Sequence, residues 1–171
     1  HTISHIDRVS GSSFFSPSGG GASTHKGASP QFIAPYIHVS EFSCPCCHQL
    51  PFDLECDHPG EPYRELFAAF AAIRTAWGRP IPINSGYRCQ ARNAVVGGEP
   101  LSAHLFGLAL DLAVKSPDEL LDLKNICVSV FPRLRVGWKR YLNAGQNLVH
   151  IDTAYLVHPR PTAKFIPGAR W

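Results

Sequence analysis

The sequence predicts an α+β domain in which helices pack on a small, mostly antiparallel sheet. Two segments repeat large apolar residues at the spacing of a helix, and four short apolar segments have the composition of strands. These segments follow one another in the order helix, strand, strand, helix, strand, strand. That order differs from the regular alternation of a parallel α/β fold and favours the α+β class.

The first helix is expected between residues 61 and 77. Large apolar side chains recur there on one helical face, at Leu66, Phe70, Ile73 and Trp77. Gly78 follows directly and is typical of a helix end. Residues 80–84 are short and rich in isoleucine and lead into a Ser-Gly turn, so they predict a strand.

The second half of the domain contains another helix and three strands. Residues 107–114 are small and apolar except for one carboxylate, Asp111, and predict a buried strand. A helix is expected from the N-cap Ser116, with a capping box completed by Glu119, as far as Pro132. Two further strands are expected at residues 134–138 and 148–153.

Composition excludes several classes of protein. The 171 residues suit one compact domain. The net charge of +3 is spread along the chain without a Lys/Arg run, so we expect no nucleic-acid partner. No stretch approaches the roughly 18 consecutive apolar residues that a membrane span needs, so we expect none.

We expect an arm or linker at residues 1–31 and the folded domain at residues 32–171. Fourteen of the 21 residues from Ser10 to Pro30 are Ser, Gly or Pro, and such a composition cannot bury enough apolar surface to fold alone. The arm is a candidate for contacting a virion or envelope partner. Because the chain starts at His1 and contains no Met, we expect a processed or trimmed product.

Three residues of the second half could bind a metal ion: His104, Asp111 and His150. A zinc hydrolase needs three protein ligands drawn from His and carboxylate, and an open fourth position for water. A single histidine in a globular domain is more often a hydrogen-bonded or surface residue than a ligand. An unpaired carboxylate in an apolar strand is costly, however, so Asp111 requires a partner.

Residues 102–111 read S-x-H-x-x-G-x-A-x-D, and this pattern resembles the signature of the zinc D-alanyl-D-alanine carboxypeptidase family. That family includes the van-type D,D-dipeptidases, phage endolysins and the hedgehog signalling fold. The segments Ser85-Gly-Tyr-Arg-Cys89, Val96-Gly-Gly98 and Glu41-Phe-Ser-Cys44, together with Asn93, also resemble it, particularly its phage-associated and bacterial wall-peptidase members. The similarity covers roughly residues 39–153.

The resemblance implies a hedgehog-like or D,D-peptidase-like zinc site on the sheet, with His104, Asp111 and His150 as ligands and zinc as cofactor. It also implies that Arg88 steadies the substrate carbonyl as this becomes an oxyanion, a task suited to a permanently charged guanidinium. Ser102 either binds substrate and supports the ligands, or is a serine that caps the loop.

The sequence departs from the family at the general base. Many members carry Glu or Asp three residues before the last histidine ligand, where this sequence has Asn147, which cannot accept a proton. Asp152 is the candidate base. The alternative is that Asp152 only orients a histidine ligand. His158 is a more distant candidate.

The function implied by the resemblance is hydrolysis of peptide bonds in peptidoglycan stem peptides by a zinc metallopeptidase, acting as a carboxypeptidase or an endopeptidase. The rival interpretation is a non-hydrolytic module that keeps the zinc fold and serves in cell-wall binding or virion structure. Asn147 favours the rival, whereas the complete motif and Arg88 favour the enzyme.

The six cysteines leave three interpretations open: disulfides, a structural zinc site and free thiols. Four of them are clustered, at Cys44, Cys46, Cys47 and Cys56. We expect Cys89 to form a disulfide with one of these four, and Cys127 to be a buried free thiol. A disulfide would place the protein outside the cytoplasm, in the periplasm, secreted or in a virion.

Overall fold

The structure of the protein is a computed structural model, which describes residues 31–52, 60–156 and 166–171. The predicted arm, except Gln31, lies outside the described residues, as do Cys56 and His158. Within the described part of the chain, no helix is long and apolar enough to cross a membrane.

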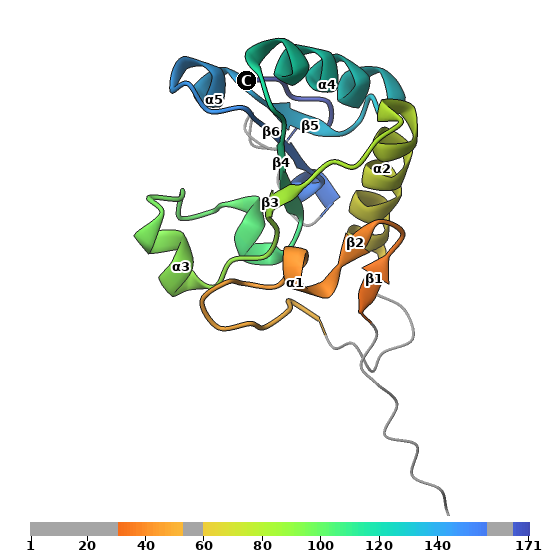
Figure 1. The fold of residues 1–171 in the computed structure, drawn as a ribbon. Coiled ribbons are helices and arrows are strands. Elements are labelled where there is room, and N and C mark those ends of the chain that lie inside the picture. The colour runs from red at the N-terminus through yellow and green to blue at the C-terminus, as the bar shows by residue number, and fades with distance from the viewer. Residues whose placement is uncertain (1–30, 53–59, 157–165) are drawn as a thin grey trace, which may run out of the picture.

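Four antiparallel strands form the central sheet, in the order β3-β4-β6-β5 (Figure 1). These strands are β3 (Ile83–Ser85), β4 (Ala109–Ala113), β5 (Arg135–Gly137) and β6 (Leu148–Asp152). A separate hairpin pairs β1 (Phe32–Ala34) with β2 (Ile37–His38). The predicted α+β class with an antiparallel sheet is confirmed.

The two long helices form where the apolar spacing predicts them. Helix α2 spans Glu61–Trp77 and ends at Gly78, whose left-handed φ of 76° lets its N–H bond the carbonyl of Arg74. Helix α4 spans Pro117–Val130, and the side chain of Ser116 caps it by accepting from the N–H of Glu119.

The reciprocal half of the predicted capping box on α4 is absent. The carboxylate of Glu119 accepts the N–H of Lys115 rather than that of Ser116, at 2.9 Å, and also pairs with Arg79 at 2.7 Å. Glu119 therefore ties the start of α4 to the loop after α2. The predicted capping box is therefore wrong in this half, because Lys115 and Arg79 engage the Glu119 carboxylate instead.

The sheet separates an apolar face from a polar face. Leu110 and Leu112 on β4, and Val149 and Ile151 on β6, belong to the buried core together with apolar residues of α2 and α4. Because side chains alternate along a strand, Asp111 of β4 points to the opposite face. Figure 1 shows α2 on one side of the sheet and α3 (Gln90–Val95) on the other.

Short elements differ most from the expectations. The strand expected at 80–84 is found at Ile83–Ser85, and the start of the expected 107–114 strand is a turn that follows a 3-10 helix, Ala103–Phe106. Three helices of four to six residues were not predicted: α1 (Val39–Phe42), α3 and α5 (Lys139–Asn143). Helices of one or two turns contain too few residues to show a helical period.

The packing of α4 can be tested with two neighbouring leucines. Leu120 is fully buried, whereas Leu121 is exposed. Leu120→Ala should lower the free energy of unfolding by about 2–5 kcal/mol, because it leaves a cavity in the core. Leu121→Ala is the matched control and should cost less than about 1 kcal/mol. Urea titration followed by circular dichroism measures both, and equal losses would contradict the packing described here.

Candidate metal centre

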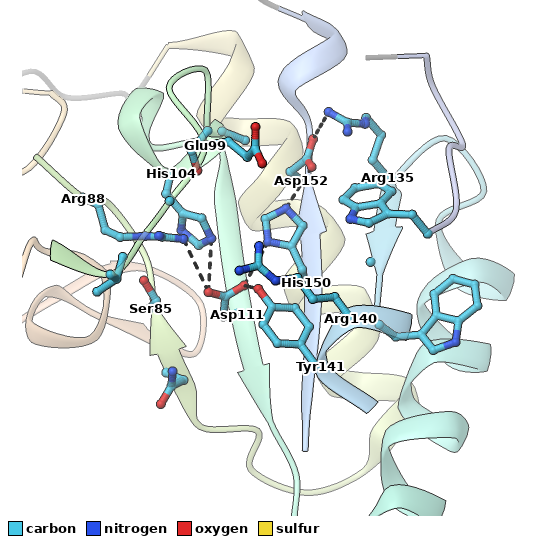
Figure 2. A pocket seen from close by; sticks show the side chains of 18 of the residues that line it. Ser85, Arg88, Glu99, His104, Asp111, Arg135, Arg140, Tyr141, His150 and Asp152 are labelled. Carbon is cyan, nitrogen blue, oxygen red and sulfur yellow. Dashed lines mark hydrogen bonds and ion pairs between the residues drawn. The ribbon is translucent and has the colours of Figure 1, made fainter. Parts of the chain in front are cut away.

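A pocket of about 620 Å³ opens over the polar face of the sheet (Figure 2). Its walls come from the loops around α3 and the 3-10 helix, from β4, β5 and β6, and from the segment 166–171. The six residues singled out from the sequence all line it, namely Arg88, Ser102, His104, Asp111, His150 and Asp152. The chain therefore gathers in one place residues that are up to 64 positions apart.

The centre of the site is a cross-strand pair. Asp111 of β4 lies directly opposite His150 of β6, and Nδ1 of His150 is 2.9 Å from Oδ1 of Asp111. Ser85 on β3 and Gly137 on β5 continue the same row across the sheet. These small residues leave the space above Asp111 and His150 to the pocket.

The third member of the group, His104, comes from the 3-10 helix that precedes β4. This helix ends at Gly107, whose φ of 68° is the left-handed conformation that favours glycine. His104 Nδ1 lies 2.6 Å from the carbonyl oxygen of Gly86. A carbonyl can only accept, so Nδ1 carries the proton and Nε2 presents its lone pair toward Asp111, 3.2 Å from Oδ2.

The three side chains are almost completely buried, and both burial and their mutual contacts shift their pKa values. Burial lowers the pKa of the His104 imidazole. Burial also acts to raise the pKa of Asp111, but the interactions with His104 and His150 outweigh it and hold this pKa well below its usual value. Burial acts to lower the pKa of His150, yet hydrogen bonds with Asp111 and Asp152 raise it to about 9.

This arrangement fits a divalent metal ion. The neutral Nε2 of His104 has no hydrogen-bond donor among the described residues, yet it faces an ionised carboxylate oxygen. A divalent cation bound to both atoms would satisfy these two acceptors. One ligand atom from each of His104, Asp111 and His150 lies within 4.8 Å of the others. Two imidazoles and one carboxylate are a typical ligand set for zinc.

Asp152 lies behind His150 and is buried. One carboxylate oxygen is 3.0 Å from Nε2 of His150, and the other is 3.1 Å from Nη1 of Arg135 and accepts the N–H of Ala154. Figure 2 shows this chain of contacts running from Asp111 through His150 to Asp152 and Arg135. Asp152 thus contacts the ring nitrogen of His150 that faces away from Asp111.

Arg88 reaches the site from the turn between β3 and α3. Its Nη2 is 3.6 Å from Oδ2 of Asp111, and its Nη1 donates to Oδ1 of the buried Asn93 at 3.4 Å. Asn93 packs tightly on Gly98, where an added Cβ would lie 2.1 Å from Oδ1 of Asn93. The Val-Gly-Gly segment therefore makes room for the asparagine that orients Arg88.

Sequence reasoning missed several residues of the site. The hydroxyl of Tyr141 donates to Oδ1 of Asp111 at 3.2 Å, and burial is the main reason that the pKa of this phenol is raised. The indole of Trp171 covers Gly137, with its ring 5.7 Å from that of His150. Glu99 also lines the pocket. No local signal marks Tyr141 or Arg135, because β5 and α5 bring them to the site only after folding.

Ser102 and Asn147 occupy different places. Ser102 stands at the N-cap position of the 3-10 helix and lines the pocket, and its side chain makes no capping hydrogen bond there. Asn147 donates through its side chain to the carbonyl of Lys115 at the start of β6. This contact engages the Asn147 amide, and Asn147 is not among the residues that line the pocket.

The disulfide predicted between Cys89 and one of the clustered cysteines is not found among the described residues, although Cys89 lies close to Cys44 and Cys47. Cys44, Cys46, Cys47 and Cys89 are free thiols. Cys127 is also free and is buried on α4, as predicted. Burial raises its pKa to about 12, which makes it unreactive.

Comparison with models of protein families gives a match. A family model described as Peptidase M15 matches residues 35–152, which is more than half of the chain. The matched region includes β3, β4, β5 and β6 and all six of the predicted site residues. A search of curated proteins found no match.

Metal content tests the three ligands. Replacement of His104 or Asp111 by Ala should remove one equivalent of zinc per chain relative to the wild type, because two remaining ligands make a weak site. Asp118→Ala, on the exposed first turn of α4, is the matched control for Asp111→Ala and should leave the zinc content unchanged. Elemental analysis measures the difference, and an unchanged content in His104→Ala would refute the assignment.

Proposed function

The chain belongs to the peptidase M15 family of zinc-dependent peptidases, and from this premise we propose that it hydrolyses peptide bonds in peptidoglycan stem peptides. The observation that carries the proposal is the placement of Arg88 beside the group formed by His104, Asp111 and His150, within one pocket. Arg88 helps to compensate the charge of Asp111, and it also lines the pocket in which a substrate would lie. Zinc, when bound, supplies a Lewis acid and a water of lowered pKa.

Arg88 is proposed to stabilise the negative charge that develops on the substrate carbonyl oxygen. Its guanidinium is mostly buried and fixed by Asn93 and Asp111, so little reorganisation is needed during the reaction. The backbone N–H of Arg88 donates to the carbonyl of His104 at 3.0 Å, which fixes the distance between the two residues. Charge stabilisation by a fixed donor is a large contribution to peptide hydrolysis.

The charge of the pocket agrees with an anionic peptide. Five arginines line it and outnumber the three carboxylates that also line it. The arginines are Arg88, Arg92, Arg135, Arg140 and Arg170, and the carboxylates are Glu99, Asp111 and Asp152. Stem peptides carry free carboxylates, which arginine recognises through paired hydrogen bonds. Because this substrate lies outside the cytoplasm, we propose an extracytoplasmic location for the protein.

Asp152 is proposed to position His150 rather than to act as the general base. Both of its oxygens are already engaged, by His150 on one side and by Arg135 and Ala154 on the other. A carboxylate on the second nitrogen of a histidine ligand fixes the ring and strengthens its basicity. Glu99 is the third carboxylate that lines the pocket, besides Asp111 and Asp152.

The second candidate function is a non-hydrolytic wall-binding or virion module. It is favoured by Asn147, which stands where a base would be expected and bonds Lys115 instead of facing the pocket. The two functions differ in turnover, so product analysis separates them.

Digestion of purified muropeptides tests the enzymatic function. The zinc-loaded protein should shorten stem peptides or separate cross-linked ones, as seen by mass spectrometry. Arg88→Ala should lower kcat by about 10²–10³-fold, because it removes one donor to the developing oxyanion. The control is Arg74→Ala, whose guanidinium stacks on Tyr36 outside the pocket and should not affect turnover.

Intact stem peptides after incubation with zinc-loaded wild type would contradict the proposal and support the non-hydrolytic module. Full activity of Arg88→Ala would instead remove Arg88 from the mechanism.

Asp152→Asn separates positioning from base catalysis. If Asp152 positions His150, the variant should bind zinc about 10–100-fold more weakly, and kcat at saturating zinc should be largely retained. If Asp152 is the base, zinc affinity should stay near the wild type while kcat collapses. Glu99→Gln is the companion variant, and a loss of kcat with full zinc content would identify Glu99 as the proton acceptor.

A further inference from the structure

A second group of possible metal ligands lies away from the histidine site. Cys44 and Cys47 belong to the turn that follows α1, and Cys89 precedes α3. The sulfur atoms of these three cysteines all lie within 4.8 Å of one another. Cys44 and Cys89 are 45 positions apart in the sequence, so the fold brings two loops together to form this group.

The turn that carries Cys44 and Cys47 is tightly closed. The N–H of His48 donates to the carbonyl of Cys44 at 2.8 Å, and the N–H of Cys44 donates to the carbonyl of Gln49 at 3.0 Å. His48 has a φ of 58°, in the left-handed region that residues other than glycine seldom adopt. This conformation turns the chain directly after Cys47 and keeps both thiols on one side of the loop.

A backbone N–H group points at the sulfur of Cys44. The N–H of Cys89 donates to this sulfur at 3.4 Å, and Cys44 is buried. An N–H donor favours the thiolate, which is the form that binds metals. The contact between the two loops therefore prepares Cys44 as a ligand before any metal arrives.

The fourth cysteine of this region is Cys46. It lies in the same turn as Cys44 and Cys47, directly before Cys47, and is exposed. A disulfide would use two of these sulfurs and leave the others as buried or crowded thiols. A tetrahedral zinc ion with bonds of about 2.3 Å places its sulfurs about 3.8 Å apart. The sulfurs of Cys44, Cys47 and Cys89 already lie within 4.8 Å of one another.

We propose that Cys44, Cys47 and Cys89 bind a second, structural zinc ion, with Cys46 as the fourth ligand. The site requires no turnover, so this inference does not rest on the proposed function. It differs from the histidine site in ligand type, because four thiolates leave no open position for water.

The second site would hold the turn that builds the first one. Cys89 directly follows Arg88, and the N–H of Tyr87 donates to the carbonyl of Phe42 at 2.7 Å. Gly86, whose carbonyl orients His104, packs so closely on Phe42 that an added Cβ would lie 2.6 Å from the Phe42 oxygen. A zinc ion between the two loops would fix this contact and with it the position of Arg88.

Zinc content of four variants tests the proposal. Wild-type protein purified with a mild reductant should carry two zinc ions per chain, and His104→Ala should keep one. Cys89→Ser and Cys46→Ser should each lose the second zinc while the histidine site stays loaded. Cys127→Ser, which changes a buried thiol on α4, is the matched control and should keep both. Retention of two zinc ions by Cys46→Ser would overturn its assignment as a ligand.

X-ray absorption of the His104→Ala protein gives a readout that needs no cysteine variant. The remaining zinc should show sulfur neighbours at about 2.3 Å. A His104→Ala protein without zinc, or with a zinc bound only by nitrogen and oxygen, would overturn the proposal. So would peptide mapping of the native protein that finds Cys89 in a disulfide with Cys44, Cys46 or Cys47.

Discussion

A buried carboxylate sets the main constraint on this structure. Asp111 lies in the middle of the sheet, on a strand whose other residues are apolar, and its side chain is almost inaccessible to water. An ionised group in such a place is costly unless charges and hydrogen bonds surround it. The chain meets this requirement with His104, His150, Tyr141 and Arg88, and this is why the loops converge on one face of the sheet.

The loops are held by backbone contacts rather than by long side chains. The carbonyl of Gly86 bonds the ring of His104, and the N–H of Arg88 bonds the carbonyl of the same residue. Close packing of Gly86 on Phe42 extends this series of contacts to α1 and the cysteine turn. The guanidinium of Arg88 is therefore positioned from two sides, by the proposed cysteine site and by the histidine site.

The sequence predicted those parts of the molecule that repeat or that follow a fixed spacing. Helices α2 and α4 have several turns of apolar residues, and the S-x-H-x-x-G-x-A-x-D pattern contains two of the three candidate ligands within eight residues. Tyr141 and Arg135 could not be predicted, because their contacts depend on the register of β5 and β6 and on a five-residue helix. A disulfide between Cys89 and the cysteine cluster was expected, but composition alone did not determine whether these cysteines form disulfides or ligate a metal.

Anomalous X-ray diffraction at the zinc absorption edge tests the central claim most directly. A crystal of the zinc-loaded wild-type protein should show an anomalous peak bonded to Nε2 of His104, a carboxylate oxygen of Asp111 and Nδ1 of His150, with one coordination position facing the pocket. A site without an anomalous peak, with Asp111 neutralised only by protonated histidines or by Arg88, would contradict the account.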